Sequence, residues 1–160
     1  MDQYKNEQLK RIALQHWIAT NLKIERAIES ISEARYSTSI APGLSTPAWI
    51  FCHLLQVNDN MFPILGFGTI LYPKLHDVMN NNEIAPHTAF ELDELRQMWI
   101  HVSSKLLEYF NGMTVDQWLE KHSNISEEDF KKEPHRNKVN VVLHRLIHMS
   151  HHAGQLALIK

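Results

Sequence analysis

The sequence predicts an all-α protein, a four-helix bundle that forms a single domain over residues 1–160. Two observations favour this fold class. Apolar residues recur at three- and four-residue steps along four long segments, and no segment shows the two-residue alternation of a half-buried strand. No internal repeat, low-complexity stretch or linker divides the chain. Four apolar helical stripes without a sheet are buried most simply against one another, so we expect a bundle.

The first helix is expected over about residues 2–35. Its apolar stripe includes one histidine and consists of Leu9, Ile12, Ala13, His16, Trp17, Thr20, Ile24, Ala27, Ile28 and Ile31. The opposite side is charged, as a solvated helix face is, although Ile18 and Leu22 interrupt it. His16 is therefore expected to point towards the core.

The second helix is expected over residues 47–62. Thr46 is suited to the N-cap, and a proline follows it at the first helical position, where a missing N–H costs nothing. Pro63 argues against a much longer helix. Four glycine or proline residues interrupt residues 66–87, which predicts a long connection between the second and third helices.

The third helix is expected to run to about Phe110, after a capping box in which Thr88 is the N-cap and Glu91 reaches back to it. Short extra helices are then expected to open near Thr114 and Ser126, before the fourth helix.

The fourth helix should run from about Asn137 to the C-terminus. It is apolar nearly all round, so it is expected to be the most buried of the four. It also carries four of the eleven histidines of the chain within nine positions, namely His144, His148, His151 and His152.

These four histidines are candidate metal ligands. His148 and His152 leave one helix face with Cβ atoms roughly 6 Å apart, and metal–imidazole bonds of about 2.0–2.1 Å let such a pair bind one ion. The pairs of His148 with His144 or with His151 have competing spacings, so spacing alone does not choose among them. An isolated pair is more often a surface or hydrogen-bonded feature than a metal site. However, unpaired imidazoles on an apolar helix cost about 1–3 kcal/mol each, and one ion satisfies several of them.

Two motifs resemble the DinB/YfiT-like superfamily. Residues 148–155 read His-Met-Ser-His-His-Ala-Gly-Gln and are similar to its C-terminal signature, in which two histidines four apart precede a residue followed by Gly-Gln. Residues 49–55 resemble its second-helix element, with an aromatic residue four positions before a third histidine and a leucine just after that histidine. Helix order and motif separation agree over nearly the whole chain. Ala153 departs from the arginine that is common in the family.

The resemblance implies that His53, His148 and His152 bind one divalent metal ion, zinc or nickel, with one coordination position open. His144 and His151 are then surface or supporting residues. The implied function is metal-dependent hydrolysis or transfer of a low-molecular-weight thiol on a small-molecule substrate, and the implied assembly is a homodimer. The alternative is a non-catalytic, stress-related metal-binding bundle. Because only neutral imidazole binds metal, we expect the ion to be lost below about pH 6.

No catalytic base is identified. The sequence His-Met-Ser-His-His lacks the glutamate that serves as base in His-Glu-x-x-His proteases. Gln56 and Asn60 share a helix face with His53 and, with His16, are the candidates for orienting a substrate. Cys52 and the tryptophans Trp17, Trp49 and Trp99 are interpreted as core packing.

Composition excludes several other function classes. Sixteen basic and eighteen acidic residues form no block of like charge, which disfavours nucleic-acid binding. No apolar run approaches the ~18 residues of a membrane span. The polar N-terminus and the single cysteine predict a cytoplasmic protein. The segment at residues 61–72 is unusually apolar for a connection, so we expect it to wall the pocket, to contact a second subunit or to cap the bundle end.

Overall fold

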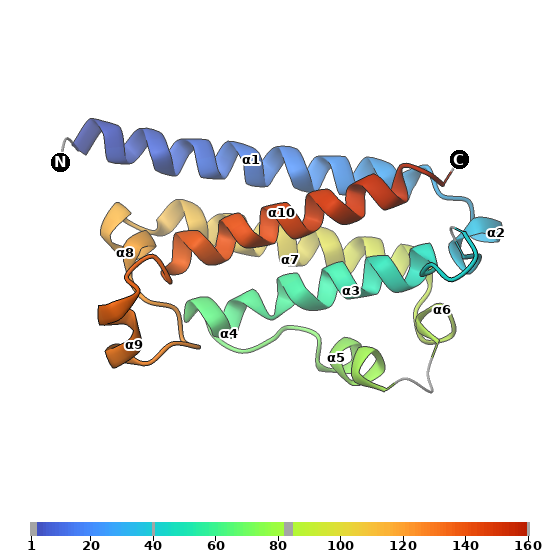
Figure 1. The fold of residues 1–160 in the computed structure, drawn as a ribbon. Helices are drawn as coiled ribbons and strands as arrows, with labels where there is room; N and C mark the ends of the chain where they lie inside the picture. The colour runs from blue at the N-terminus through green and yellow to red at the C-terminus, as the bar shows by residue number, and fades with distance from the viewer. Residues whose placement is uncertain (1–2, 40, 82–84, 160) are drawn as a thin grey trace.

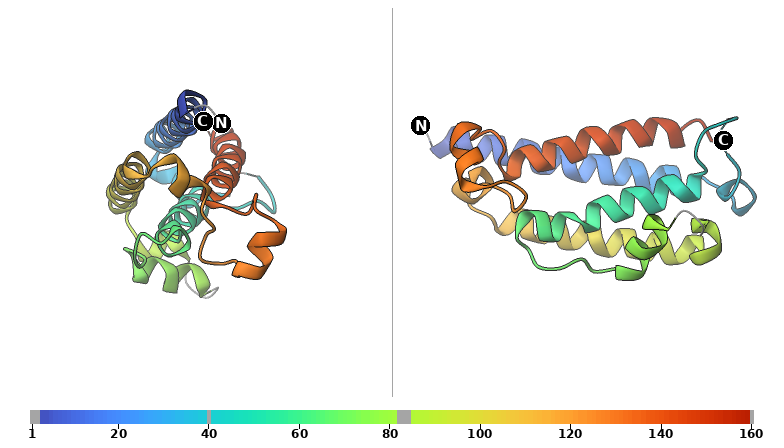
Figure 2. Two further views of the ribbon diagram at one scale, coloured as in Figure 1. Left: turned by 90° about the vertical axis from the view of Figure 1, so that its left-hand side faces the viewer. Right: turned by 60° about the horizontal axis from the view of Figure 1, so that its bottom comes forward.

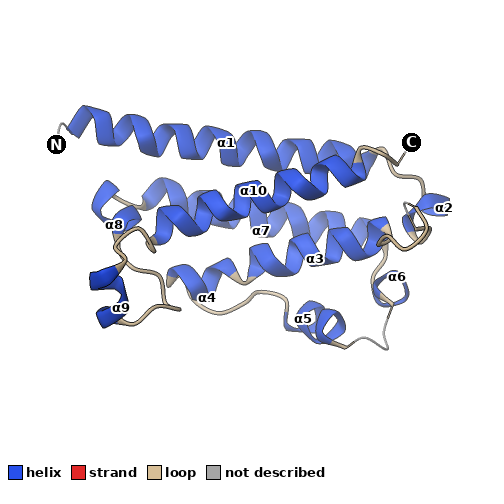
Figure 3. Cartoon of the chain, in the orientation of Figure 1, coloured by secondary structure: helices blue, strands red, loops and turns tan. Residues whose placement is uncertain are grey.

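The computed structural model in Figure 1 describes residues 3–39, 41–81 and 85–159. Four long helices lie along one another: α1 (Gln3–Glu29), α3 (Pro47–Asp59), α7 (Leu92–Gly112) and α10 (Lys138–Leu156). Short helices join them: α2 (Glu33–Tyr36), α4 (Met61–Leu65), α5 (Pro73–Asn80), α6 (Pro86–Ala89), α8 (Val115–Leu119) and α9 (Glu127–Lys132). Within the described ranges there is no strand, as Figure 3 shows, so the all-α prediction is confirmed.

The order of the helices in space explains the long connection between α3 and α7. Helices α1 and α3 each pack against α7 and α10. Helices α3 and α7 run in the same direction along the bundle (Figures 1 and 2), so the chain between them must return along its length. It returns through α5 and α6 on the outside of α3. The sequence predicted this connection but not helix α5.

Four predicted helix starts are confirmed. The Thr46 hydroxyl accepts the Trp49 backbone N–H at 3.1 Å. Thr114 forms a complete capping box at the start of α8, and the Asn137 side chain accepts a backbone N–H at the start of α10. The short helix after Ser126 is also present as α9.

The capping box predicted at Thr88 is wrong. Thr88 lies inside α6, and its hydroxyl donates to the backbone carbonyl of Ala85. Helix α7 begins four residues later, after extended backbone at Phe90, and Glu91 at its N-cap makes no side-chain cap bond. The proline that opens α6 starts a separate single turn of helix. The Thr88 hydroxyl bonds back to the N-cap residue of that turn and not to the start of α7.

Two predicted helix ends also differ from the structure. The first long helix stops at Glu29 and not near residue 35, where the separate α2 lies. The second stops at Asp59, and the chain then turns into α4. Pro63 does not break this helix, because it lies in the first turn of α4, where its missing N–H needs no partner. Gly66, with φ of 78°, ends α4 in the left-handed conformation that glycine tolerates.

Helix α10 is not the most buried helix, contrary to prediction. Nine of the 13 residues of α3 are buried, against six of the 19 residues of α10. The apolar residues Leu143 and Ile147 of α10 are 45% and 70% exposed. Helix α3 is covered by α5 and α6 as well as by α7 and α10, whereas none of the described short helices covers the outer face of α10 in this way. An apolar sequence pattern does not show which neighbours a helix will have.

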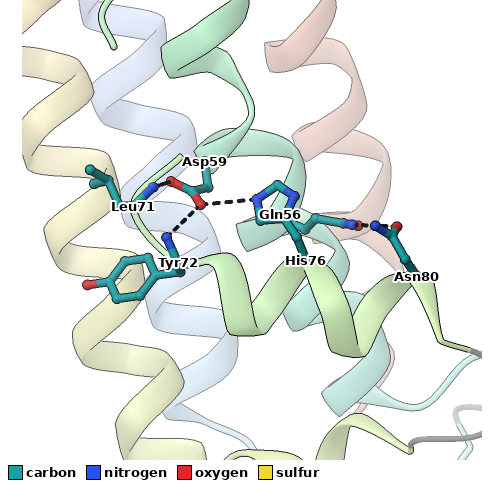
Figure 4. A network of polar contacts seen from close by, with 6 residues as sticks. All are labelled: Gln56, Asp59, Leu71, Tyr72, His76 and Asn80. Atoms are coloured by element: carbon teal, nitrogen blue, oxygen red, sulfur yellow. Dashed lines mark hydrogen bonds and ion pairs between the residues drawn. The ribbon is translucent and has the colours of Figure 1, made fainter. Parts of the chain in front are cut away.

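The connection after α3 is anchored by a buried carboxylate (Figure 4). Asp59 is fully buried and accepts the backbone N–H groups of Leu71 and Tyr72 at 2.8 and 3.0 Å. The Nε2 atom of His76, on α5, lies 3.1 Å from the same carboxylate. These contacts hold the start of α5 against α3, so Asp59 is a structural group that is directed away from the predicted histidine site.

The apolar segment at residues 61–72 packs against the bundle end. Met61, Phe62 and Leu65 are buried in the core. The ring of Phe67 stacks on Tyr109 of α7, with centroids 4.5 Å apart and planes 4° apart. Intramolecular packing thus accounts for its apolar composition. The homodimer stays a prediction. No helix within the described ranges is long and apolar enough to cross a membrane.

Candidate metal centre

Three histidines from two helices come together between α3 and α10. His53 projects from α3, while His148 and His152 project from successive turns of α10. The Nε2 atom of His148 lies 3.1 Å from Nε2 of His53 and 3.1 Å from Nε2 of His152. All three candidate ligand atoms lie within 4.8 Å of one another.

This arrangement fits a divalent ion. Two nitrogens bound to one tetrahedral ion through bonds of about 2.0–2.1 Å lie roughly 3.3 Å apart. Both distances to His148 are close to that value. His144 and His151 are exposed and outside the cluster, although the His151 ring contacts that of His152. The structure thus brings together the three residues that the sequence motifs singled out.

Gln155 sets the orientation and tautomer of His152. The Nδ1 atom of His152 lies 2.6 Å from Oε1 of Gln155, one turn further along α10. Because a carbonyl oxygen only accepts, the ring hydrogen is on Nδ1 and the lone pair of Nε2 is directed into the cluster. Such partners of the second ring nitrogen are usual at metal-binding histidines. The motif contained Gln155, and its i+3 spacing from His152 was the signal for this role.

Trp49 belongs to the site and not to the core. Its indole stacks on the imidazole of His53, with centroids 4.9 Å apart and planes 16° apart. The side chain is 38% exposed, whereas Trp17 and Trp99 are buried as predicted. The four-residue spacing of Trp49 and His53 on α3 places one above the other. Stacking restricts the His53 ring and leaves part of the indole open beside the cluster.

Burial and mutual repulsion keep the three imidazoles neutral. Burial, followed by the charges of the nearby His152, Arg145, His53 and His144, lowers the pKa of His148 to about 4. Burial, followed by the charges of His152 and Arg145, also lowers the pKa of His53. Burial lowers the pKa of His152, against a smaller opposite effect of Gln155. Neutral imidazoles carry the free lone pairs that metal binding needs, so metal loss is now expected at a more acidic pH than 6.

The depressed pKa of these histidines predicts acid-sensitive folding of the metal-free protein. Between the unfolded value of about 6.5 and the folded value of about 4 for His148, the unfolded chain binds more protons. The free energy of unfolding should therefore fall as pH falls through this window. Urea unfolding at a series of pH values measures the effect. The free energy of unfolding of the His148→Gln variant should fall less steeply with acidification than that of wild type, and that of the exposed His151→Gln variant should fall as steeply. Equal slopes for wild type and both variants would contradict this prediction.

The three residues proposed to orient a substrate, His16, Gln56 and Asn60, are poorly placed for that role. The prediction that His16 points inward is wrong, because its side chain is exposed. At 100° per residue it lies about 100° round α1 from the buried Trp17. The amide nitrogen of Gln56 donates to Oδ1 of Asn80, and Asn60 is exposed between α3 and α4. No hydrogen bond of the described residues joins these three to the histidine cluster.

Cys52 is a packing residue, as predicted. It is fully buried next to His53 in sequence, but it faces the core. Burial raises the pKa of its thiol to about 12, with a smaller contribution from Glu94. A thiol with so high a pKa carries almost no thiolate at neutral pH and is a poor nucleophile or ligand.

Comparison with known proteins agrees with the sequence motifs. A family model described as the DinB superfamily matches residues 18–156. The matched range includes α3, α7 and α10 and all three clustered histidines. No curated protein matches the chain. Because the family model covers most of the chain, this protein belongs to the DinB superfamily.

Proposed function

We propose that the protein is a metal-dependent enzyme that binds one divalent ion through His53, His148 and His152. The observation that carries this proposal is the convergence of three Nε2 atoms from two helices. The fixed tautomer of His152 supports it, because Gln155 directs the ring lone pair into the cluster. Zinc or nickel is the proposed ion, since imidazole nitrogen suits both.

The proposed reaction is hydrolysis or thiol transfer on a small molecule. Three protein ligands leave a coordination position for substrate, which distinguishes catalytic from closed structural sites. A bound divalent ion would lower the pKa of a coordinated water or thiol and so supply the deprotonation. This matters because no carboxylate of the described residues joins the histidine cluster, and Asp59 is engaged elsewhere. The partly exposed indole of Trp49 offers an apolar wall to a substrate.

Thiol binding tests this function. Zinc-loaded protein should bind cysteine measurably in calorimetry and bind serine, its hydroxyl analogue, at least tenfold more weakly, because zinc prefers thiolate to a neutral hydroxyl. The metal-free protein and zinc-treated His148→Ala should bind neither. A loaded protein that binds no thiol and no other small ligand would favour the alternative, a non-catalytic metal-binding bundle. Thiol binding of equal strength without metal would contradict the proposal.

A further inference from the structure

Arg145 is a partly buried cation that pairs with no carboxylate of the described residues. Its Nε atom is inaccessible to solvent and has no hydrogen-bond partner within the part of the chain that the structure describes. No ion pair of the described residues includes it, whereas Arg96 and Arg136 each pair with an acidic side chain. Burial lowers its pKa to about 10, which reflects the cost of holding a charge away from water. A cation kept at this cost without a counter-ion needs an explanation beyond packing.

The contact that Arg145 does make lies at the metal centre. Its Nη1 atom is 3.3 Å from Nδ1 of His148. A guanidinium only donates, so Nδ1 accepts and the ring hydrogen of His148 is on Nε2. That hydrogen is directed at Nε2 of His53 and of His152, both at 3.1 Å. The hydrogen-bond pattern in the structure is therefore internally consistent, with Arg145 as donor.

This contact is incompatible with metal binding by His148. A neutral imidazole that binds an ion through Nε2 carries its hydrogen on Nδ1. The Nδ1–H group would then face the guanidinium, and two donors cannot form a hydrogen bond. Metal binding thus releases Arg145 from His148 and leaves a guanidinium beside the centre that requires an acceptor.

We propose that Arg145 binds a carboxylate of the substrate next to the metal ion. The planar fork of a guanidinium matches the two oxygens of a carboxylate, and the low polarity around a partly buried arginine strengthens the pairing. The proposal rests on the proposed function and narrows its substrate to small molecules that carry an anionic group close to the metal-binding atom. Arg145 is then a specificity-determining residue.

Two small thiols, one anionic and one neutral, test this role. Mercaptoacetate carries a carboxylate where 2-mercaptoacetamide carries a neutral amide of nearly the same shape. Calorimetry should show that zinc-loaded wild type binds mercaptoacetate more tightly than the amide. In Arg145→Gln the affinity for mercaptoacetate should fall about 10- to 100-fold, as expected for a lost charge-assisted hydrogen bond, and that for the amide should change little. The affinity of Arg145→Lys for mercaptoacetate should lie between those of wild type and Arg145→Gln. Arg136→Gln removes the same charge at an exposed ion pair and should behave as wild type.

Zinc affinity separates this role from a structural one. Arg145→Gln should bind zinc as tightly as wild type or more tightly, because a positive charge next to the ion is removed. Loss of zinc from this variant would mean that Arg145 merely positions His148, and would overturn the proposal. An unchanged ratio of the two thiol affinities, or no binding of mercaptoacetate by loaded wild type, would also overturn it. A wild type that binds no zinc would instead remove the proposed function, and this inference with it.

Discussion

Replacing His148 with alanine should lower zinc affinity by more than about 100-fold and leave the purified protein without stoichiometric metal. The reason is geometric, because the Nε2 atom of His148 lies 3.1 Å from the ring nitrogens of both His53 and His152. Without it, only two of the three ligand nitrogens remain, and the atom that lies next to both of them is gone. Loss of a partner that orients a ligand typically costs 10- to 100-fold, and loss of the ligand itself costs more. His53→Ala and His152→Ala should have similar effects. Competition with a chromogenic chelator measures each affinity.

Two neighbouring histidines are the controls for this experiment. His144→Ala and His151→Ala change the same residue type on the same helix, but both side chains are exposed and outside the cluster. Their zinc affinity should match that of wild type. Gln155→Ala should show an intermediate loss of about 10- to 100-fold, because it frees the ring of His152. A His151→Ala variant that loses zinc while His152→Ala keeps it would make the ligand assignment wrong.

The second large effect is expected on stability, at Asp59. Asp59→Ala should lower the free energy of unfolding by about 2–4 kcal/mol, since it leaves the backbone N–H groups of Leu71 and Tyr72 without their acceptor. It also removes the partner of His76, so the start of α5 should detach from α3. Urea unfolding monitored by circular dichroism measures the change.

Asp77 is the matched control for Asp59. It is an exposed acidic residue of α5, the helix whose start Asp59 holds, and Asp77→Asn should change stability by less than about 0.5 kcal/mol. Zinc affinity should be nearly unaffected in Asp59→Ala, because the carboxylate is directed away from the histidine cluster. Equal stability of the Asp59→Ala and Asp77→Asn variants would show that the buried carboxylate does not anchor the connection.

The histidine site was largely predictable from sequence, because short-range spacing carries the geometry. The four-residue step of His148 and His152 places both rings on one face of α10, and the resemblance supplied His53 from a distant helix. The contacts that support the three histidines could be predicted only in part. The sequence shows that Trp49 lies four residues before His53 and that Gln155 lies three residues after His152. Whether each pair makes contact depends on side-chain rotamers, which spacing does not give. Arg145 gave no sequence signal, because the absence of an acidic partner is a tertiary property.

The errors in the predicted fold have a common physical cause. Periodicity shows that a face is apolar, but not whether another element covers it. His16 lies near the edge of the stripe of α1 and is exposed. Ile147 is exposed because no helix of the described ranges covers the outer face of α10. Local hydrogen bonds can likewise be satisfied in more than one way. Thr88 matched a capping box, yet its hydroxyl bonds within α6.

Anomalous diffraction from crystals of the zinc-loaded protein, recorded on both sides of the zinc absorption edge, tests the central claim most directly. The proposed assignment predicts one zinc peak per chain, within about 2.0–2.1 Å of Nε2 of His53, His148 and His152, with a fourth position taken by water or an added thiol. The guanidinium of Arg145 should be turned away from Nδ1 of His148. A peak on His144 or His151, or no peak between α3 and α10 at full zinc occupancy in solution, would contradict the assignment.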